Sequence, residues 1–272
     1  MTPTALDAIL APGGLSMLFQ PILEVQGERP VVCAAEALAR GPKGSTMESA
    51  AILFDYVRGK RQQVAVDRAC VAKAIEAAEG LPPNLDVSIN VHAMTLSSDP
   101  DFLCSLADAA AAREIALSRI VVEIVEHAPE WADAGLLESL DALRRSGIRI
   151  ALDDVGLGQS NYRMILDCRP DYFKIDRYFV KGSHRDFYRR AVIESISHLA
   201  GRFGGRVIAE GVEDPEDLET VRSLGIGLAQ GYLFGRATAP SDLVAHHFQP
   251  ARTSDHATSS GTWRNGGSWG AA

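Results

Sequence analysis

Ionisable or amide side chains recur near the C-terminal ends of short apolar segments in this sequence. They are Glu36, Asn90, Glu123, Asp153, Asp154, Lys174, Glu210 and Gln230. Five carboxylates cannot be neutralised by one lysine, since two like charges about 4 Å apart repel by roughly 4 kcal/mol at an effective dielectric near 20. Oxygen donors without His or Cys suit hard cations such as Mg²⁺ or Mn²⁺. The set therefore predicts a divalent metal site, and the adjacent Asp153 and Asp154 suggest two-metal phosphoryl chemistry.

These side chains need a scaffold that brings them together. Short apolar runs alternate with longer amphipathic stretches, which is typical of a β/α protein with a mostly parallel sheet. We predict strands over residues 16–22, 31–38, 85–91, 120–126, 148–155, 171–176, 206–212 and 229–235. We predict helices over 47–79, in two parts broken near Gly59, and over 100–113, 134–146, 186–203 and 215–224. Eight strands in about 250 residues favour a TIM-type (β/α)8 barrel, whose rim at the C-terminal strand ends would collect the polar set.

Each polar side chain also has an ordinary structural interpretation. By itself, Glu36 would be a solvated rim residue, Asn90 a turn-forming amide and Lys174 an exposed lysine. Asp153 and Asp154 would form a helix N-cap pair. The joint occurrence of such residues at the same end of consecutive strands favours a functional site over coincidence.

Composition excludes several classes of protein. The chain has 272 residues, of which 46% are hydrophobic and 23% charged, so it is globular rather than disordered. Its net charge of −8 disfavours nonspecific binding to DNA or to an anionic membrane surface. No signal peptide is recognisable, and no run approaches the roughly 18 apolar residues of a membrane span, so we expect a cytoplasmic protein. The widely spaced cysteines predict buried, reduced thiols. They are Cys33, Cys70, Cys104 and Cys168.

The chain divides into three predicted segments. Residues 1–14 form a lead segment, residues 15–249 the folded domain, and residues 250–272 a flexible tail rich in Ser and Gly. Trp263 and Trp269 in the tail suggest a docking element, although its composition favours disorder with two incidental aromatic residues. The lead segment leaves no room for a second signalling module, so the chain is either a stand-alone domain or a piece of a longer protein.

The ordered set of motifs resembles the EAL domain, a bacterial phosphodiesterase module for cyclic di-GMP. The naming motif is Glu36-Ala37-Leu38, followed by Arg40. The resemblance extends from about residue 15 to residue 240 and includes FQPI (19–22), SIN (88–90), EIVE (123–126), DD (153–154), KID (174–176), AEGVE (209–213) and QGY (230–232). It implies a TIM-like barrel in which the first strand runs antiparallel to the others.

The resemblance also implies roles for matching residues and two Mg²⁺ or Mn²⁺ ions per site. One ion would be held by Glu36, Asn90, Glu123 and Asp153, and the second by Asp153, Asp154 and Glu210. Lys174 and Glu210 would orient or help deprotonate the water that cleaves cyclic di-GMP to linear pGpG. Substrate contacts are implied for Gln20, Leu38, Arg40, Glu213 and Gln230. Glu126 would anchor the loop that follows Asp154.

The loop after Asp154 departs from the family pattern. The family typically has Phe-Gly-Thr-Gly-Tyr-Ser-Ser, whereas residues 155–161 here are VGLGQSN. In the family this loop helps to hold the second metal and couples to dimerisation, which leaves a cyclic di-GMP receptor or protein-interaction module as the alternative function. The complete ligand set favours the enzyme, and a barrel acting on another phosphodiester has little support. The expected partners are cyclic di-GMP, a second copy of the chain, and a regulatory domain or protein, with neither DNA nor a membrane among them.

Overall fold

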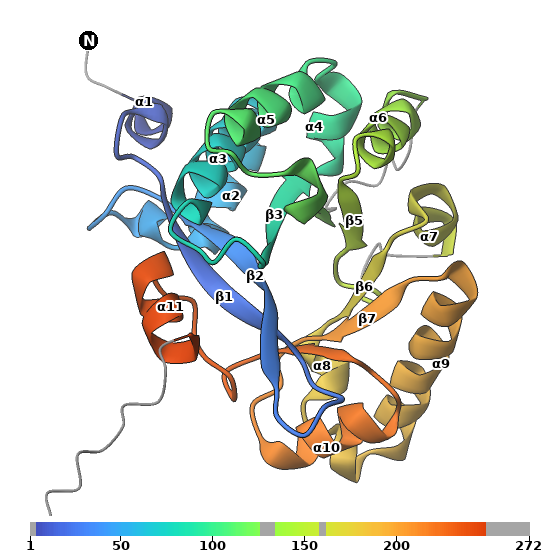
Figure 1. Ribbon diagram of the computed structural model, residues 1–272. Helices are drawn as coiled ribbons and strands as arrows, with labels where there is room; N and C mark the ends of the chain where they lie inside the picture. The colour runs from blue at the N-terminus through green and yellow to red at the C-terminus, as the bar shows by residue number, and fades with distance from the viewer. Residues whose placement is uncertain (1–3, 126–133, 158–161, 249–272) are drawn as a thin grey trace, which may run out of the picture.

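The computed structural model describes residues 4–125, 134–157 and 162–248. In it, eight strands close into a barrel in the order β1 to β8 (Figure 1). The first strand runs antiparallel to both of its neighbours, and the remaining pairs are parallel. The strands are β1 (Ser16–Glu24), β2 (Val31–Arg40), β3 (Asp86–His92), β4 (Ile120–Val125), β5 (Arg149–Leu152), β6 (Tyr172–Ile175), β7 (Arg206–Ala209) and β8 (Leu228–Gln230). The predicted TIM-like barrel with an antiparallel first strand is confirmed.

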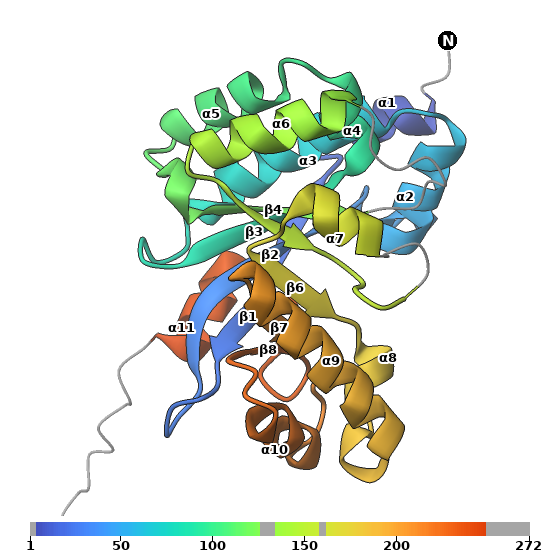
Figure 2. The same cartoon turned by 90° about the vertical axis from the view of Figure 1, so that its right-hand side faces the viewer.

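Helices surround the barrel, with α9 packed along β6 and β7 (Figures 1 and 2). The α-helices are α1 (Ala5–Leu10), α2 (Ala50–Gly59), α3 (Gln63–Ala78), α4 (Ala93–Ser98), α5 (Phe102–Ala111), α6 (Ala134–Arg145), α7 (Tyr162–Cys168), α8 (Arg177–Val180), α9 (Phe187–Phe203), α10 (Pro215–Ser223) and α11 (Pro240–His247). Short 3-10 helices are η1 (Thr46–Glu48), η2 (Leu117–Arg119) and η3 (Ser183–Arg185). The long helices lie where they were predicted. Helices α1, α4, α7, α8 and α11 were missed because elements of about two turns or fewer show too little periodicity.

Three strands end three or more residues before their predicted C-terminal ends. Strand β5 ends at Leu152, β7 at Ala209 and β8 at Gln230, against predicted ends at 155, 212 and 235. Left-handed backbone ends the first two, because Asp154 has φ 51° and Gly211 has φ 64°. The acidic residues after these strands therefore lie on loops at the rim. The predicted strand 120–126 stops at Val125, and Glu126 lies outside the described residues.

The core lies between the barrel and its helices. The side chains of β6 alternate between this core and the inside of the barrel. Phe173 and Ile175 are fully buried, and the Phe173 ring packs edge-on against Phe203 of α9 at 6.2 Å between centroids. Burying each such side chain contributes roughly 1.5–3 kcal/mol. Lys174 is only 2% exposed and points into the barrel, as the alternation predicted. Hydrophobic packing on one side of β6 thus fixes an ammonium group on the other.

The predicted lead segment contains α1, which packs onto the domain core. Thr4 and Asp7 form a capping box at its start, and Ile9 is 1% exposed. The boundaries of the three segments stay predictions, and the tail with its two tryptophans lies outside the described residues.

The cysteine prediction needs one correction. All four cysteines are free thiols, and Cys70 and Cys168 are buried, but Cys33 is half-buried and Cys104 is exposed. Cys104 lies on α5 midway between the buried Phe102 and Leu106, on the side of the helix that does not face the core, so helical periodicity and not thiol chemistry decides its exposure. Among the described residues, no helix is both long and apolar enough to cross a membrane.

Candidate metal and substrate site

Lys174 lies at the centre of a ring of carboxylates. Its Nζ lies 2.6 Å from Oε1 of Glu210, 3.4 Å from Oδ1 of Asp153 and 3.5 Å from Oε2 of Glu36, and it also pairs with Glu123. These acids come from β2, β4 and the loops after β5 and β7. Side chains far apart in the sequence thus converge at the C-terminal strand ends, as a barrel rim requires.

Amide and hydroxyl groups hold the innermost carboxylates in place. Asn90 Nδ2 donates to Glu36 Oε1 at 2.9 Å, and Gln230 Nε2 donates to Glu36 Oε2 at 2.7 Å. Ser88 Oγ donates to Glu123 Oε2 at 2.9 Å. No role was predicted for Ser88, although it lies two residues before Asn90 and alternation places both on the inner face of β3. The position of Ser88 on the same face of the strand as Asn90 could have identified it as a site residue.

Burial and mutual repulsion raise the pKa values of three acids. Burial is the largest cause for Glu123, whose pKa lies well above its ordinary value, with the Glu36 charge adding to it. The pKa of Glu210 is raised to about 8, mainly by burial and also by the Asp153 charge. Burial and Asp153 raise the pKa of Asp154 to about 6. The chain by itself therefore supplies too little positive charge to keep all of these acids ionised at neutral pH.

Two groups at the site keep their charge instead. Burial by itself would lower the pKa of Lys174, but Asp153, Glu123 and the other acids raise it well above its ordinary value. Burial would likewise raise the pKa of Glu36, but the Lys174 charge and the hydrogen bonds from the neighbouring amides lower it. An ion pair between Lys174 and Glu36 therefore persists, while Glu123, Asp154 and Glu210 stay short of positive charge.

Asp153, Asp154 and Glu210 form a group of oxygen donors at the outer side of Lys174. One carboxylate oxygen from each lies within 4.8 Å of the others. The left-handed backbone at Asp154, which is strained for a residue other than glycine, lets two adjacent acids reach the same place. The turn is held by the N–H of Val155, which donates to the Lys174 carbonyl at 3.0 Å. Hard oxygen donors at this spacing fit a divalent cation such as Mg²⁺ or Mn²⁺.

A polar cavity of about 190 Å³ opens beside the carboxylates. Four of the five predicted substrate residues line it, namely Gln20, Leu38, Glu213 and Gln230. Arg40 is not part of its wall, and its Nη1 donates to the Ala39 carbonyl at 2.9 Å.

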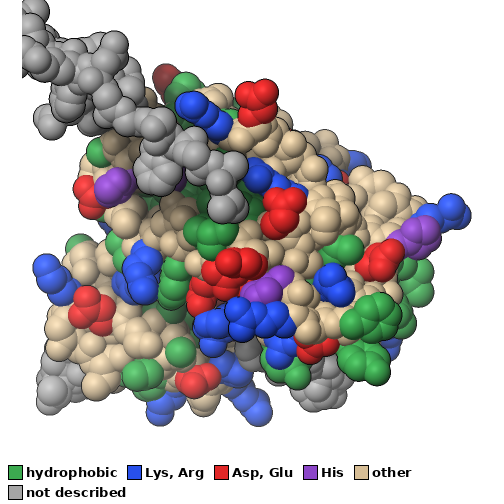
Figure 3. All heavy atoms as spheres, turned by 90° about the horizontal axis from the view of Figure 1, so that it is seen from below, with side chains coloured by type: hydrophobic (Ala, Val, Ile, Leu, Met, Phe, Trp, Pro, Cys, Tyr) green, Lys and Arg blue, Asp and Glu red, His purple; other side chains and the backbone are tan. Residues whose placement is uncertain are grey.

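Three side chains in the cavity wall were not predicted. They are Asp176, Arg177 and Tyr232, which follow the observed ends of β6 and β8. Tyr232 is half-exposed, and the Arg236 guanidinium stacks on its ring at 4.0 Å from the centroid. The available signal was the motifs KID (174–176) and QGY (230–232), which contain Asp176 and Tyr232 and precede Arg177. On the face shown in Figure 3, acidic and basic side chains are interspersed, with a small basic group near the middle of the view.

The closed barrel, its antiparallel first strand and the acidic rim beside a polar cavity place this protein among TIM-like barrels whose sites are built from strand ends. The chain belongs to the EAL domain family, because the family model for the EAL domain matches residues 4–237.

Two curated relatives show the range of this similarity. The chain is 29% identical over 246 residues to the probable cyclic di-GMP phosphodiesterase PdeG of Escherichia coli (strain K12), covering 85% of this chain and 46% of PdeG. It is 30% identical over 151 residues to the blue light- and temperature-regulated antirepressor BluF of the same organism, covering 56% of this chain and 38% of BluF. It therefore spans less than half the length of these curated relatives.

Among solved structures, the barrel superimposes on the Klebsiella pneumoniae BlrP1 complex with manganese and cy-diGMP, with a TM-score of 0.75 and 29% identity. The match covers 85% of this chain and 58% of BlrP1.

Proposed function

We propose that this chain is a metal-dependent phosphodiesterase that hydrolyses cyclic di-GMP to linear pGpG. The observation that carries this proposal is the ring of carboxylates around Lys174, which lies beside a cavity lined by amides and acids. Two comparisons support it: PdeG carries the name of a probable cyclic di-GMP phosphodiesterase, and the BlrP1 structure contains manganese with the nucleotide.

We assign the two predicted cation sites to these donors. Glu36, Asn90, Glu123 and Asp153 would hold one ion, and Asp153, Asp154 and Glu210 the second. Bound divalent ions supply positive charge that lowers the pKa of water and stabilises charge on phosphoryl oxygens. The raised pKa values of Glu123, Asp154 and Glu210 support this assignment, because carboxylates short of positive charge are what a cation would relieve.

Glu210 and Lys174 are the proposed catalytic residues. Glu210 accepts a proton from the attacking water, since its carboxylate can act as a general base within hydrogen-bond reach of that water. Lys174 holds the Glu210 carboxylate by the 2.6 Å contact and so fixes the direction of proton transfer. The water oxygen forms a bond to phosphorus, the bond from phosphorus to the 3′-oxygen breaks in line, and the leaving oxygen takes a proton from solvent.

Guanine recognition is assigned to the acids and amides of the cavity. The Glu213 carboxylate can accept hydrogen bonds from the N–H groups of a guanine edge, and Gln20 offers both donor and acceptor. Oε1 of Gln230 is buried and has no hydrogen-bond partner within the described part of the chain, which leaves an acceptor for the ligand. Leu38 would pack against the nucleotide. Arg40 would contact a phosphate oxygen only after its side chain leaves the Ala39 carbonyl.

A homodimer stays a prediction, and the face between α7 and α9 is where we expect it. Tyr162, Leu166 and Tyr188 are exposed there, and large exposed aromatic groups are enriched at interfaces. The cytoplasmic location, the regulatory partner and the loop-anchoring role of Glu126 also stay predictions.

The second candidate function is a receptor that binds cyclic di-GMP without cleaving it. Two observations favour it, namely the altered loop after Asp154 and the match to BluF, whose name is that of an antirepressor. The two functions share the cavity and differ in turnover.

An assay for pGpG separates the two functions. Purified protein is incubated with cyclic di-GMP and Mg²⁺ or Mn²⁺, and we expect turnover that is abolished in Glu36→Gln. Glu24→Gln is the matched control, since Glu24 is an exposed acid at the opposite end of the β1–β2 pair. Nucleotide binding without pGpG formation in either metal would establish the receptor instead.

A further inference from the structure

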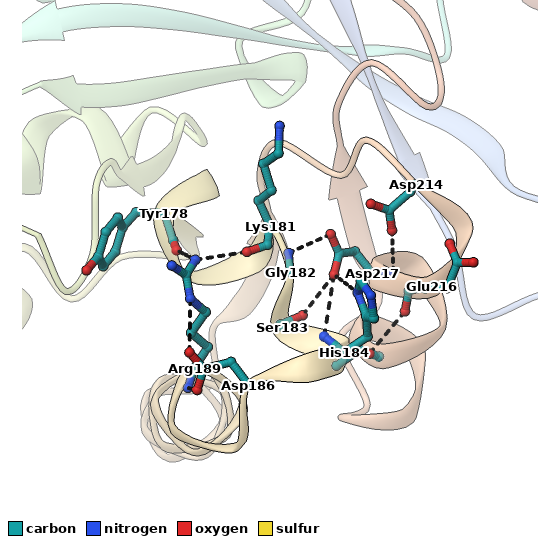
Figure 4. Close-up of polar contacts among 11 residues, drawn as sticks. Tyr178, Lys181, Gly182, Ser183, His184, Asp186, Arg189, Asp214, Glu216 and Asp217 are labelled. Atoms are coloured by element: carbon teal, nitrogen blue, oxygen red, sulfur yellow. Dashed lines mark hydrogen bonds and ion pairs between the residues drawn. The ribbon is translucent and has the colours of Figure 1, made fainter.

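A partly buried histidine–aspartate pair lies outside the carboxylate ring, between η3 and α10. Nδ1 of His184 lies 2.7 Å from Oδ1 of Asp217, and the Asp217 side chain is fully buried. Figure 4 shows Asp217 facing the backbone of residues 182–184, with contacts to each of them. One carboxylate on α10 thus holds a segment that follows β6.

The Asp217 carboxylate is occupied by donors from this segment. The N–H of Gly182 donates to Oδ2 at 2.9 Å, while the Ser183 hydroxyl and the His184 N–H approach Oδ1 at 3.5 Å. Burial by itself would raise the pKa of Asp217, but these hydrogen bonds, led by that of the His184 ring, hold it below its ordinary value. An ionised and buried acceptor with several donors is a strong and directional contact.

The same group does not have the character of a cation site. Oxygens of Asp214 and Asp217 lie with a His184 nitrogen within 4.8 Å of one another. However, Asp214 caps α10 by accepting the N–H of Asp217 at 2.9 Å, and Asp217 already accepts from the η3 segment. These contacts tie residues 182–184 and the start of α10 to the same carboxylates, so the arrangement acts as a clamp.

The clamp lies next to the wall of the nucleotide cavity. Lys181, which precedes the clamped segment, forms an ion pair with Glu213, one residue before the Asp214 cap. Glu213 lines the cavity, and so does Arg177 at the start of α8. The two wall segments are in close contact, because a Cβ on Gly211 would lie only 2.1 Å from Cβ of Arg177.

The other side of this segment is fastened to α9. Nη1 of Arg189 donates to the Lys181 carbonyl at 2.8 Å and also to the Tyr178 carbonyl, and Asp186 pairs with the same guanidinium (Figure 4). Arg189 therefore fixes the distance from the segment to α9. The distance from the segment to α10, and hence to Glu213, is fixed by Asp217.

We propose that His184 and Asp217 are positioning residues for the nucleotide cavity: by clamping residues 182–184 to α10 they hold the Lys181–Glu213 pair, and with it the Glu213 carboxylate, in the orientation that binds guanine. This inference rests on the proposed function. Neither residue touches the reacting atoms, so loss of the clamp weakens nucleotide binding and leaves the chemical step unchanged.

Two variants of His184 test the clamp with kinetics and rescue. His184→Leu removes the ring donor, and we expect KM for cyclic di-GMP to rise about tenfold while kcat stays within about twofold. His184→Asn restores a donor near the position of Nδ1, and its KM should return to within about threefold of the wild type. Amide hydrogen exchange without nucleotide should be faster at Gly182 in His184→Leu only.

Asp99→Asn is the control for a loss of stability away from the clamp. Asp99 is buried, pairs with Arg68 and lies away from the cavity wall, so this variant should lose stability with an unchanged KM. An unchanged KM in His184→Leu, an equal loss in kcat, or a His184→Asn variant as impaired as His184→Leu would each overturn the positioning role. A wild-type chain that neither binds nor cleaves cyclic di-GMP would overturn the proposed function as well, so the two failures are distinguishable.

Discussion

The Nζ of Lys174 lies 2.6 Å from Oε1 of Glu210, although the two residues come from different strand ends of the barrel. Lys174 is 2% exposed, and its ammonium group is shared with three further carboxylates. Lys174 thus connects Glu36, whose pKa is lowered, with Glu210, whose pKa is raised.

Glu210→Gln should lower kcat for cyclic di-GMP hydrolysis by about 10²–10⁴-fold, because the amide keeps the shape of the side chain but cannot accept the proton of the water. Product formation measured as pGpG checks this. Asp242→Asn serves as the control, because Asp242 lies on α11 and is not part of the cavity wall. Retention of more than a tenth of the wild-type kcat would remove Glu210 from the role of base.

Addition of Mn²⁺ to metal-free protein should raise its melting temperature, because a cation relieves the repulsion among Asp153, Asp154 and Glu210. At a hundredfold excess over Kd, binding to the folded state alone adds about 2.7 kcal/mol to the free energy of unfolding. Calorimetric melting with and without chelator measures the shift. The double variant Asp153→Asn and Asp154→Asn should show a smaller shift, and an equal shift would place the ion elsewhere.

Gly211→Ala should destabilise the protein and weaken nucleotide binding. Its φ is 64°, and the added Cβ would lie 2.1 Å from Cβ of Arg177, so the cavity wall must move. Strain of this kind costs about 1–3 kcal/mol before any rearrangement. Gly225→Ala is the matched control, since Gly225 has φ 74° with open space around its Cβ position. Urea unfolding measures the loss of stability, and nucleotide titration measures the loss of affinity. If both variants lose the same amount of each, the contact with Arg177 has no specific role.

Asp217→Asn should lower the free energy of unfolding at pH 7 by about 1–3 kcal/mol, the usual contribution of hydrogen bonds to a charged group. The pKa of Asp217 is depressed in the folded state. Its contribution is therefore present above the unfolded value of about 3.9 and is lost as pH falls through the folded value. Urea unfolding at several pH values should show the wild type and the variant converging below about pH 4. A gap that stays constant with pH would mean that the charge of Asp217 is not the cause.

The sequence alone was sufficient for the order of long elements and for most of the acidic ring. Alternation along β6 predicted that Lys174 would point inward, and the helix over 186–203 was placed within one residue of α9 at its start. Both patterns are local, because the periods of strands and helices depend only on neighbouring residues. The direction of β1 was beyond this reasoning, since alternation is the same for either strand direction, and it came from the family resemblance.

Contacts between segments that are distant in the sequence determined the features of the site that the sequence did not predict. The left-handed backbone at Asp154 ended β5 early and brought two adjacent acids to one place, whereas a regular strand would point them to opposite faces. Arg40 donates to the carbonyl beside it, and His184 meets Asp217 across 33 positions of chain. A single sequence indicates which residue types are present at a rim. It does not give the hydrogen-bond partner of each side chain, because the distances between strands that are neighbours in space are set only when the barrel closes.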